Sequence, residues 1–333
     1  MRSVSKQMKT YNYGIIGPGR IAASFCKALQ RSERVKIYGV ASRDEQRAKD
    51  FATTFGATKV YNSYEAIASD PDIDVIYIAT PHAFHAEQAI MCLNHKKPVV
   101  CEKPLTLDHA TALKIVQAAR DNKTFLLEGM WSRFNPAIRL AKELIDQGTI
   151  GEVRHITADF GFKKDYDPKS RLYDLALGGG SILDVGIYPL FLALFILGKP
   201  DTIQAVSKLA PTGADESCGF TLHYKYGATA QLFSSMIVET RKDAEICGTR
   251  GSIVIQTPWY KSQGLIVSKE GSPEERIPLP YPGNGFEFQI DEVTKCLDLD
   301  LLESPLMPHD FTLLKAQVSD EIIRQAGVKY GGK

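Results

Sequence analysis

The sequence lacks paired cysteines, a strong net charge and long apolar runs. Its six cysteines include no C-x-x-C pair, which argues against a structural zinc site and for reduced, buried thiols in the cytoplasm. The net charge of +1 gives no sign of a nucleic acid or a membrane as a partner. The longest apolar run, near residues 190–197, is too short to cross a bilayer. We therefore expect a cytoplasmic protein with a small-molecule partner.

A secretory leader is also missing. The first ten residues carry basic side chains but no apolar segment, so we expect a short leader outside the fold and not a signal peptide. The chain does have length and an ordinary composition: 333 residues, 44% hydrophobic and 24% charged, are enough for two globular domains. We expect these domains to cover residues 1–130 and 131–333, with a hinge near 127–134.

The first of these domains alternates between apolar strands and amphipathic helices. Near-continuous apolar strands separated by helices predict a doubly wound parallel sheet covered on both faces, which is an α/β fold. We expect strands at 11–16, 35–41, 74–79, 98–101 and 124–127, and helices at 20–30, 45–55, 85–94 and 108–120.

A glycine-rich turn follows the first strand and opens the first helix. It reads GPGRIA over residues 17–22, which is the G-x-G-x-x-A pattern. Gly17 permits the tight turn, Gly19 leaves room for a pyrophosphate, and the helix N-terminus offers N–H groups to phosphate. The strand–turn–helix context predicts a Rossmann dinucleotide site. We expect its cofactor contacts to include Gly17, Gly19, Arg20 and Ile21.

The end of the second strand selects the cofactor. It carries Ser42 and Arg43 where an NAD site usually has a carboxylate for the ribose hydroxyls. A guanidinium can bind the 2′-phosphate of NADP and stack on adenine. We therefore expect NADP, with NAD as the less favoured cofactor. The alternative is that Arg43 is a solvated residue at a helix start and that Asp44 binds the ribose.

The third strand ends at Thr80 and Pro81, which we expect to border the nicotinamide. His82, His85 and Glu87 follow, but their spacing fits no common zinc motif. We expect the histidines to be polar groups at a helix start, with His85 close to the cofactor, and we expect no metal.

The fourth strand stops at Glu102-Lys103-Pro104. Strands of open α/β sheets present ligand-binding groups at their carboxyl ends, so both charged residues should border the ligand. Pro104 restricts Lys103 to extended geometry, and a cis bond would aim the lysine further. The alternative is an ordinary turn with a solvated lysine.

The sequence pattern of the second domain differs from that of the first. Strand-like runs separated by short turns predict an antiparallel meander, and helices return near the C-terminus. We expect an α+β domain with an open-faced sheet large enough for an interaction surface. At the hinge, Trp131, Arg133 and Phe134 are candidates for the wall of a substrate pocket; a plain packing role is the alternative for each aromatic.

A glycine run at 178–180 leads into an apolar helix that carries Asp184 and Tyr188. The two lie at i and i+4, so they should share a face, and a carboxylate and a phenol on a buried element need partners. Pro189 should bend the helix where Tyr188 projects. The spacing allows two interpretations equally, a catalytic pair or a structural hydrogen bond.

Together these motifs resemble the Gfo/Idh/MocA family, named for glucose–fructose oxidoreductase, inositol dehydrogenase and rhizopine catabolism. The resemblance spans nearly the whole chain, and Glu-Lys-Pro at this place is specific to the family. The wider family often has histidine where Tyr188 stands. This chain departs from that pattern, and the departure favours the branch of dimeric dihydrodiol dehydrogenase and NADP-dependent D-xylose dehydrogenase. The resemblance implies a Rossmann domain, dimerisation through the open sheet, and catalysis by Lys103, Asp184 and Tyr188.

These residues suggest hydride exchange between NADP(H) and a carbinol carbon of a sugar, polyol or cyclic diol. Free tyrosine and lysine both titrate near pH 10, so neither is a ready base at neutral pH. We expect Lys103 to favour the tyrosinate of Tyr188, which makes Tyr188 the acid/base and Lys103 the group that orients the substrate oxygen. The roles could be exchanged. Asp184 should hold the lysine or a substrate hydroxyl.

Two other functions fit the same motifs. Some relatives bind NADP without catalysis and act as redox or sugar sensors, although the complete set of Lys103, Asp184 and Tyr188 favours an enzyme. Another possibility is a family oxidoreductase that acts on an amino sugar or an imine.

Overall fold

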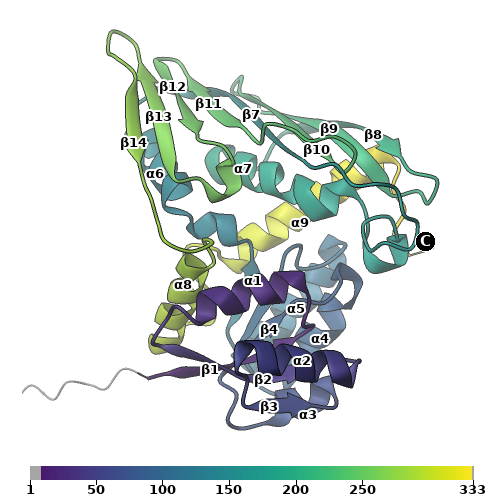
Figure 1. The fold of residues 1–333 in the computed structure, drawn as a ribbon. Coiled ribbons are helices and arrows are strands. Elements are labelled where there is room, and N and C mark those ends of the chain that lie inside the picture. The colour runs from purple at the N-terminus through teal and green to yellow at the C-terminus, as the bar shows by residue number, and fades with distance from the viewer. Residues whose placement is uncertain (1–8, 332–333) are drawn as a thin grey trace, which may run out of the picture.

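Two sheets organise the protein (Figure 1). The computed structural model describes residues 9–331. The leader expected over the first ten residues lies outside the described residues, apart from Lys9 and Thr10.

The N-terminal lobe is built on a six-stranded parallel sheet, as the sequence predicts. Its strands are β1 (Tyr11–Ile16), β2 (Val35–Ala41), β3 (Lys59–Tyr61), β4 (Val75–Ile78), β5 (Val99–Glu102) and β6 (Leu126–Gly129). The order β3-β2-β1-β4-β5-β6 reverses between β1 and β4, so their carboxyl ends border the switch point where ligands bind in such sheets. Strand β3 was not predicted; it has only three residues, two of them exposed, and so shows no apolar run.

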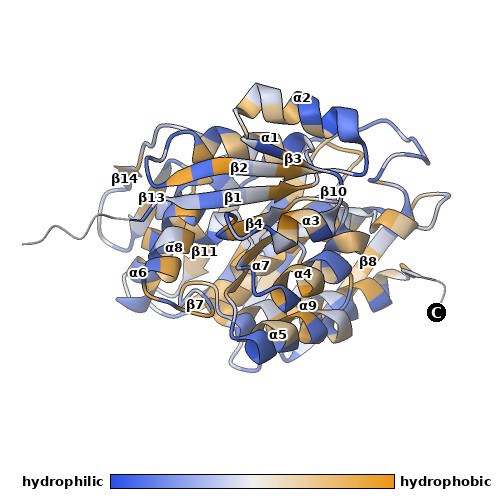
Figure 2. Cartoon of the chain, turned by 90° about the horizontal axis from the view of Figure 1, so that it is seen from below, coloured by the Kyte–Doolittle hydropathy of each residue, from blue (hydrophilic) through white to orange (hydrophobic). Residues whose placement is uncertain are grey.

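Five helices within the described residues accompany this sheet. They are α1 (Arg20–Leu29), α2 (Glu45–Phe55), α3 (Tyr64–Ser69), α4 (His85–Asn94) and α5 (His109–Asn122). Asp108 caps α5 by accepting from the Thr111 amide at 2.7 Å. Figure 2 shows hydrophilic segments on the outer sides of α2 and α5, as expected for helices that bury one face.

The second lobe carries an eight-stranded sheet in the order β14-β13-β12-β11-β7-β10-β9-β8. Its strands are β7 (Val153–Gly161), β8 (Thr202–Leu209), β9 (Asp215–His223), β10 (Thr229–Ser235), β11 (Ala244–Gly248), β12 (Gly251–Ile255), β13 (Gly264–Lys269) and β14 (Glu275–Pro278). All neighbours are antiparallel except β7 and β10, which lie parallel and are separated along the chain by a helical segment and by β8 and β9.

Helices cover one face of this sheet in Figure 1. They are α6 (Pro136–Asp146), α7 (Ile187–Leu197) and α9 (His309–Ala326). Asn135 caps α6, and Pro136 occupies the first position of the helix, where a missing N–H is tolerated. A π-helical turn, Ile182–Gly186, runs directly into α7.

The helical run Leu175–Leu197 is longer than the sequence suggested. By length and composition alone it could cross a membrane, which corrects the expectation that every apolar run is too short. The sequence stretch looked shorter because Asp184, Gly186 and Pro189 interrupt it. It is 83% buried inside the molecule, as a core helix would be.

Helix α8 (Glu287–Asp298) ties the C-terminal part of the chain to the first lobe. It lies beside α1 in Figure 1. Asn284 Nδ2 donates to the Ser24 carbonyl at 2.8 Å, and Asp298 pairs with Arg34 at 2.8 Å. A residue that follows the predicted hinge by more than 150 positions therefore packs against the dinucleotide half, which restricts how freely the lobes can move.

Candidate active site

Lys103 points inward, at the carboxyl end of β5. Its Nζ donates to the main-chain oxygen of Asp184 and lies 3.7 Å from the Asp184 carboxylate. The Lys103 side chain is 11% exposed, and the Lys103–Pro104 peptide bond is cis. The solvated-turn alternative is therefore wrong. Burial lowers the pKa of the Lys103 ammonium, and the nearby negative charges of Asp184 and Glu102 oppose that shift only in part.

Asp184 collects two cations. Arg171 Nη1 lies 3.2 Å from Asp184 Oδ1, on the same oxygen that faces Lys103. Burial alone would raise the pKa of this carboxyl, but the charges of Lys103 and Arg171 outweigh burial and lower the pKa to about 2. Arg171 was not predicted from the sequence, because it lies in a loop 13 residues before its partner without a recognisable motif.

Tyr188 presents its ring, and not its hydroxyl, to the lysine. Lys103 Nζ lies 5.0 Å from the ring centroid, while the hydroxyl accepts from Trp131 Nε1 at 2.9 Å. Burial raises the pKa of Tyr188 well above 10, and Glu102 raises it further. The expected stabilisation of a tyrosinate by Lys103 is therefore wrong, since burial dominates at this site.

The turn before α7 brings Asp184 and Tyr188 to the same site. Gly178 and Gly180 have φ values of 81° and 128°, and a Cβ on Gly178 would lie 2.9 Å from the His82 side chain. Asp215 then caps the new helical turn, because its Oδ2 accepts from the Ile182 amide at 2.8 Å.

The irregularity of this helix also differs from the prediction. It lies in the π-helical turn at Ile182–Gly186 and not at Pro189. Pro189 is the third residue of α7 and lies directly after this turn.

The glycine turn forms a cradle suited to a dinucleotide phosphate. Gly17 has a φ of 85°, and a Cβ there would meet the Thr80 amide nitrogen at 2.8 Å. Gly19 caps α1 without a side-chain hydrogen bond, and a Cβ there would meet nothing nearer than 3.8 Å. A bare helix N-terminus beside open space matches what a pyrophosphate needs, so these residues fit the cofactor. Arg20 and Ile21, the first residues of α1, are both exposed.

The end of β2 places two arginines beside this turn. Asp44 caps α2 by accepting from the Arg47 amide at 3.0 Å, and the Ser42 hydroxyl accepts from the Asp44 amide. The Arg43 guanidinium lies over the Phe84 ring at 5.0 Å. Arg47 Nε donates to the Pro18 carbonyl at 3.0 Å, which adds a second arginine that the sequence analysis missed.

The end of β4 connects this cradle to Lys103. Thr80 Oγ1 donates to Gln88 at 2.7 Å, and Pro81 starts the short 3₁₀ helix His82–Phe84. His82 Nδ1 contacts the Gly178 carbonyl at 3.2 Å, and burial lowers its pKa to about 3. His85 contacts the carbonyls of Thr80 and Pro104. Within residues 9–331, no group of three or more His, Cys, Asp or Glu side chains could hold a metal.

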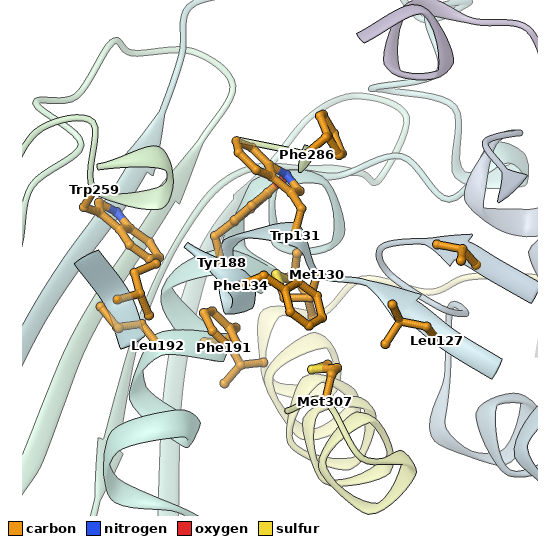
Figure 3. Close-up of a cluster of buried hydrophobic side chains, with 14 of the residues drawn as sticks. Leu127, Met130, Trp131, Phe134, Tyr188, Phe191, Leu192, Trp259, Phe286 and Met307 are labelled. Atoms are coloured by element: carbon orange, nitrogen blue, oxygen red, sulfur yellow. The ribbon is translucent and has the colours of Figure 1, made fainter. Parts of the chain in front are cut away.

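Aromatic rings surround Tyr188. Trp131 stacks on Phe286 with centroids 4.8 Å apart, as Figure 3 shows, and Phe160 lies 5.2 Å from Tyr188. Tyr260 stacks on Phe160 at 4.2 Å. Of the rings around Tyr188, Trp131 alone was predicted from the sequence, because the others come from distant segments.

The other two hinge candidates face elsewhere. The Arg133 guanidinium lies over the ring of Phe195 at 4.0 Å, and burial lowers its pKa to about 10. Phe134 is 1% exposed and packs among the hydrophobic side chains of Figure 3, near Phe191 and Met130. Trp131 therefore contacts Tyr188, whereas Arg133 contacts α7.

The Rossmann turn suited to a phosphate and the buried lysine–carboxylate pair place this protein in the class of dinucleotide-dependent oxidoreductases. Comparison with known families agrees. Residues 11–130 match the oxidoreductase family with the NAD-binding Rossmann fold, and residues 138–254 match the GFO/IDH/MocA C-terminal domain. The chain belongs to the Gfo/Idh/MocA family of oxidoreductases.

Relatives of known activity cover nearly the whole chain. Trans-1,2-dihydrobenzene-1,2-diol dehydrogenase of Xenopus laevis is 36% identical over 96% of this chain and 98% of its own length. The Homo sapiens protein of the same name is 33% identical over 96% and 97%.

Solved structures share the fold of this chain over nearly its whole length. KijD10, a 3-ketoreductase from Actinomadura kijaniata in complex with NADP and TDP-benzene, superposes with a TM-score of 0.86 at 25% identity. The alignment covers 97% of this chain and all of that one. Aldose-aldose oxidoreductase from Caulobacter crescentus, complexed with glycerol, gives 0.86 at 26% identity over 96% of this chain and 98% of its own.

Proposed function

We propose that this oxidoreductase uses NADP to exchange a hydride with a carbinol carbon of a cyclic diol or a sugar, through Lys103, Asp184 and Tyr188. The observation that carries the proposal is the inward Lys103, whose ammonium meets Asp184 at the carboxyl edge of the parallel sheet. That edge also carries the Gly17 cradle. The diol and sugar relatives supply the substrate class.

Proton transfer is assigned to Lys103. In the oxidation, the C–H bonding pair leaves the carbinol carbon as hydride, the O–H proton passes to the Lys103 amine, and a carbonyl remains. NADP, when bound, accepts that hydride. A lysine whose pKa is lowered by burial is a better base near neutral pH than a tyrosine whose pKa is raised. Tyr188, which accepts from Trp131, keeps its own proton free to donate to the substrate oxygen.

Asp184 has a separate role in this scheme. Its carboxylate stays ionised down to about pH 2, so it holds the protonated lysine that forms during oxidation. Arg171 on the same oxygen prevents Asp184 from binding the lysine too tightly. The proton can therefore return to the substrate in the reverse reaction.

NADP is favoured over NAD on the arrangement at the end of β2. Asp44 Oδ1 is engaged as the cap of α2, so this carboxylate is less available to the ribose hydroxyls of NAD. Arg43 and Arg47 leave positive charge beside the phosphate cradle. Ser42, Thr80 and Pro81 are assigned to the cofactor from their places at the strand ends.

The aromatic rings around Tyr188 favour a planar or partly apolar ring substrate. Trp131, Phe160 and Tyr260 can pack on a cyclic diol, and a sugar presents similar C–H faces to aromatic rings. We therefore expect trans-dihydrodiols and aldopyranoses as substrates.

We further propose a cytoplasmic homodimer formed through the uncovered face of the eight-stranded sheet. Helices cover only one face in Figure 1, and Val206 of β8 is 78% exposed. Among the described residues all six cysteines are free, as in a reducing compartment. Light scattering of the wild type and of Val206→Lys tests the dimer, which the variant should weaken.

The experiment that tests the function mixes the protein with NADP or NAD and a panel of diols and aldoses. Formation of NADPH at 340 nm with at least one diol or sugar is the expected result. Saturable NADP binding without turnover on any substrate would favour a sensor and contradict the proposal.

A further inference from the structure

The peptide unit that follows Pro104 is held at both ends. His85 Nδ1 lies 2.9 Å from the Pro104 carbonyl oxygen, and the Leu105 amide donates to Glu128 Oε1 at 3.0 Å. Both contacts are buried. Because this carbonyl and this amide belong to one rigid plane, the two contacts fix its orientation.

Each of the two holding groups is anchored in turn. His85 Nε2 lies 2.9 Å from the Thr80 carbonyl oxygen, just beyond β4. Glu128 comes from β6, and its Oε1 also accepts from Lys315 of α9. The side chains of Glu128 and Lys315 are 1% and 2% exposed. The turn after Lys103 is therefore tied to β4, β6 and a C-terminal helix of the second lobe.

This arrangement acts on Lys103 through the backbone. Lys103 directly precedes Pro104, so a rotation of the next peptide plane would swing its ammonium away from Asp184. We propose that Glu128 and His85 are positioning residues that hold Lys103 by clamping the Pro104–Leu105 peptide, and that Lys315 anchors the buried Glu128 carboxylate. The inference rests on the proposed function, since it concerns the lysine assigned to proton transfer.

The protonation of His85 decides how the clamp works. Both ring nitrogens face carbonyl oxygens, and a neutral imidazole has only one N–H to donate. Burial lowers the pKa of the ring most, and the contacts to the Pro104 and Thr80 carbonyls raise it. Among the charged groups, Lys103 lowers this pKa and Glu128 raises it, while the His82 ring lies 5.7 Å away. The proposed clamp uses the neutral ring with its proton on Nδ1, which donates to the Pro104 carbonyl.

Two double variants separate the clamp from the ion pair. Glu128→Leu with Lys315→Met removes the pair and the acceptor of the Leu105 amide. Glu128→Gln with Lys315→Met removes the same pair but keeps an amide oxygen as acceptor. Neither leaves an unpaired buried charge. We expect the leucine variant to lose about 10- to 100-fold in kcat relative to the glutamine variant, with NADPH affinity in both within about twofold.

A merely structural role predicts another pattern. The two double variants would then differ in melting temperature but have equal kcat in the folded protein. Equal kcat, or a loss confined to KM, overturns the inference.

A second pair of variants covers the case in which the leucine variant does not fold. His85→Asn keeps an N–H near the Nδ1 position, toward Pro104, whereas His85→Gln keeps one near Nε2, toward Thr80. We expect His85→Asn to retain at least fivefold more kcat than His85→Gln. The reverse order, or equality, overturns the clamp.

Crystal structures distinguish a failed inference from a failed function. If the wild type turns over no substrate, the proposed function is wrong. The inference still requires that Lys103 Nζ moves away from Asp184 in the Glu128→Leu/Lys315→Met and His85→Gln proteins. It also requires that Lys103 keeps its wild-type position in the glutamine and asparagine variants. A lysine in the wild-type position in the Glu128→Leu/Lys315→Met and His85→Gln structures contradicts the inference.

Discussion

Two buried lysines lie on either side of one turn and differ in how they are paired. Lys315 is 2% exposed and contacts the Glu128 carboxylate directly. Lys103 is 11% exposed, lies 3.7 Å from a carboxylate that it shares with Arg171, and donates to a main-chain carbonyl. Burial lowers the pKa of both ammonium groups.

Under the proposed function, Lys315 is a structural cation and Lys103 is one that exchanges a proton. An ammonium that directly meets its own buried carboxylate has little to gain from a substrate oxygen. One that shares its carboxylate with a second cation, at the edge of a ligand site, can give up or take a proton at small cost. Four changes test this contrast, from the largest expected effect to the smallest.

Lys103→Met should remove the exchangeable proton. General acid–base catalysis contributes about 10²- to 10⁴-fold, so kcat should fall by that factor. NADPH binding, followed by fluorescence titration, should change by less than about threefold. Retained turnover would show that the lysine does not take part in the chemistry.

Lys315→Met should affect stability instead. Leaving Glu128 buried without its partner should cost about 3–5 kcal/mol in the free energy of unfolding, measured by urea denaturation. Adding Glu128→Leu should recover most of that loss, because no buried charge remains. A Lys315→Met protein as stable as the wild type would mean that Lys315 does not have the structural role that separates it from Lys103.

Arg43→Ala tests a cation that lies over a ring and not beside a carboxylate. Losing a charge-assisted contact to the 2′-phosphate should cost about 1.5–3 kcal/mol of NADP affinity, or about 10- to 150-fold. The affinity for NAD should hardly change. Equal losses for both cofactors in calorimetric titrations would refute the NADP assignment.

Arg171→Met should have the smallest effect. The Arg171 side chain is 44% exposed, so its pairing with Asp184 is screened and worth at most about 1 kcal/mol. We expect kcat for oxidation to fall by no more than about fivefold, since Asp184 then holds the protonated Lys103 more tightly. A loss as large as that of Lys103→Met would make Arg171 part of the chemistry.

Local patterns predicted the first lobe well. The alternating strands and the Gly17 turn each depend on residues close in sequence, which periodicity and turn rules can detect. Glu102-Lys103-Pro104 was also found as a motif, and the structure places it at the strand end as expected.

Contacts between distant segments could not be predicted in the same way. Arg171, Phe160 and Tyr260 reach the site from loops and strands of the second lobe without a motif. The pKa direction of Tyr188 was missed because burial, a tertiary property, outweighs the neighbouring lysine. The pairing of Glu128 with Lys315 spans 187 positions.

The pH dependence of kcat for diol oxidation by Tyr188→Phe tests the central claim most directly. Oxidation needs the neutral amine, so kcat of the wild type should rise with pH through an ionisation below 10.5 and then level off. The account predicts that Tyr188→Phe, although slower, keeps this ionisation, because it belongs to Lys103. A flat profile in Tyr188→Phe would assign the proton transfer to the tyrosine and contradict the account.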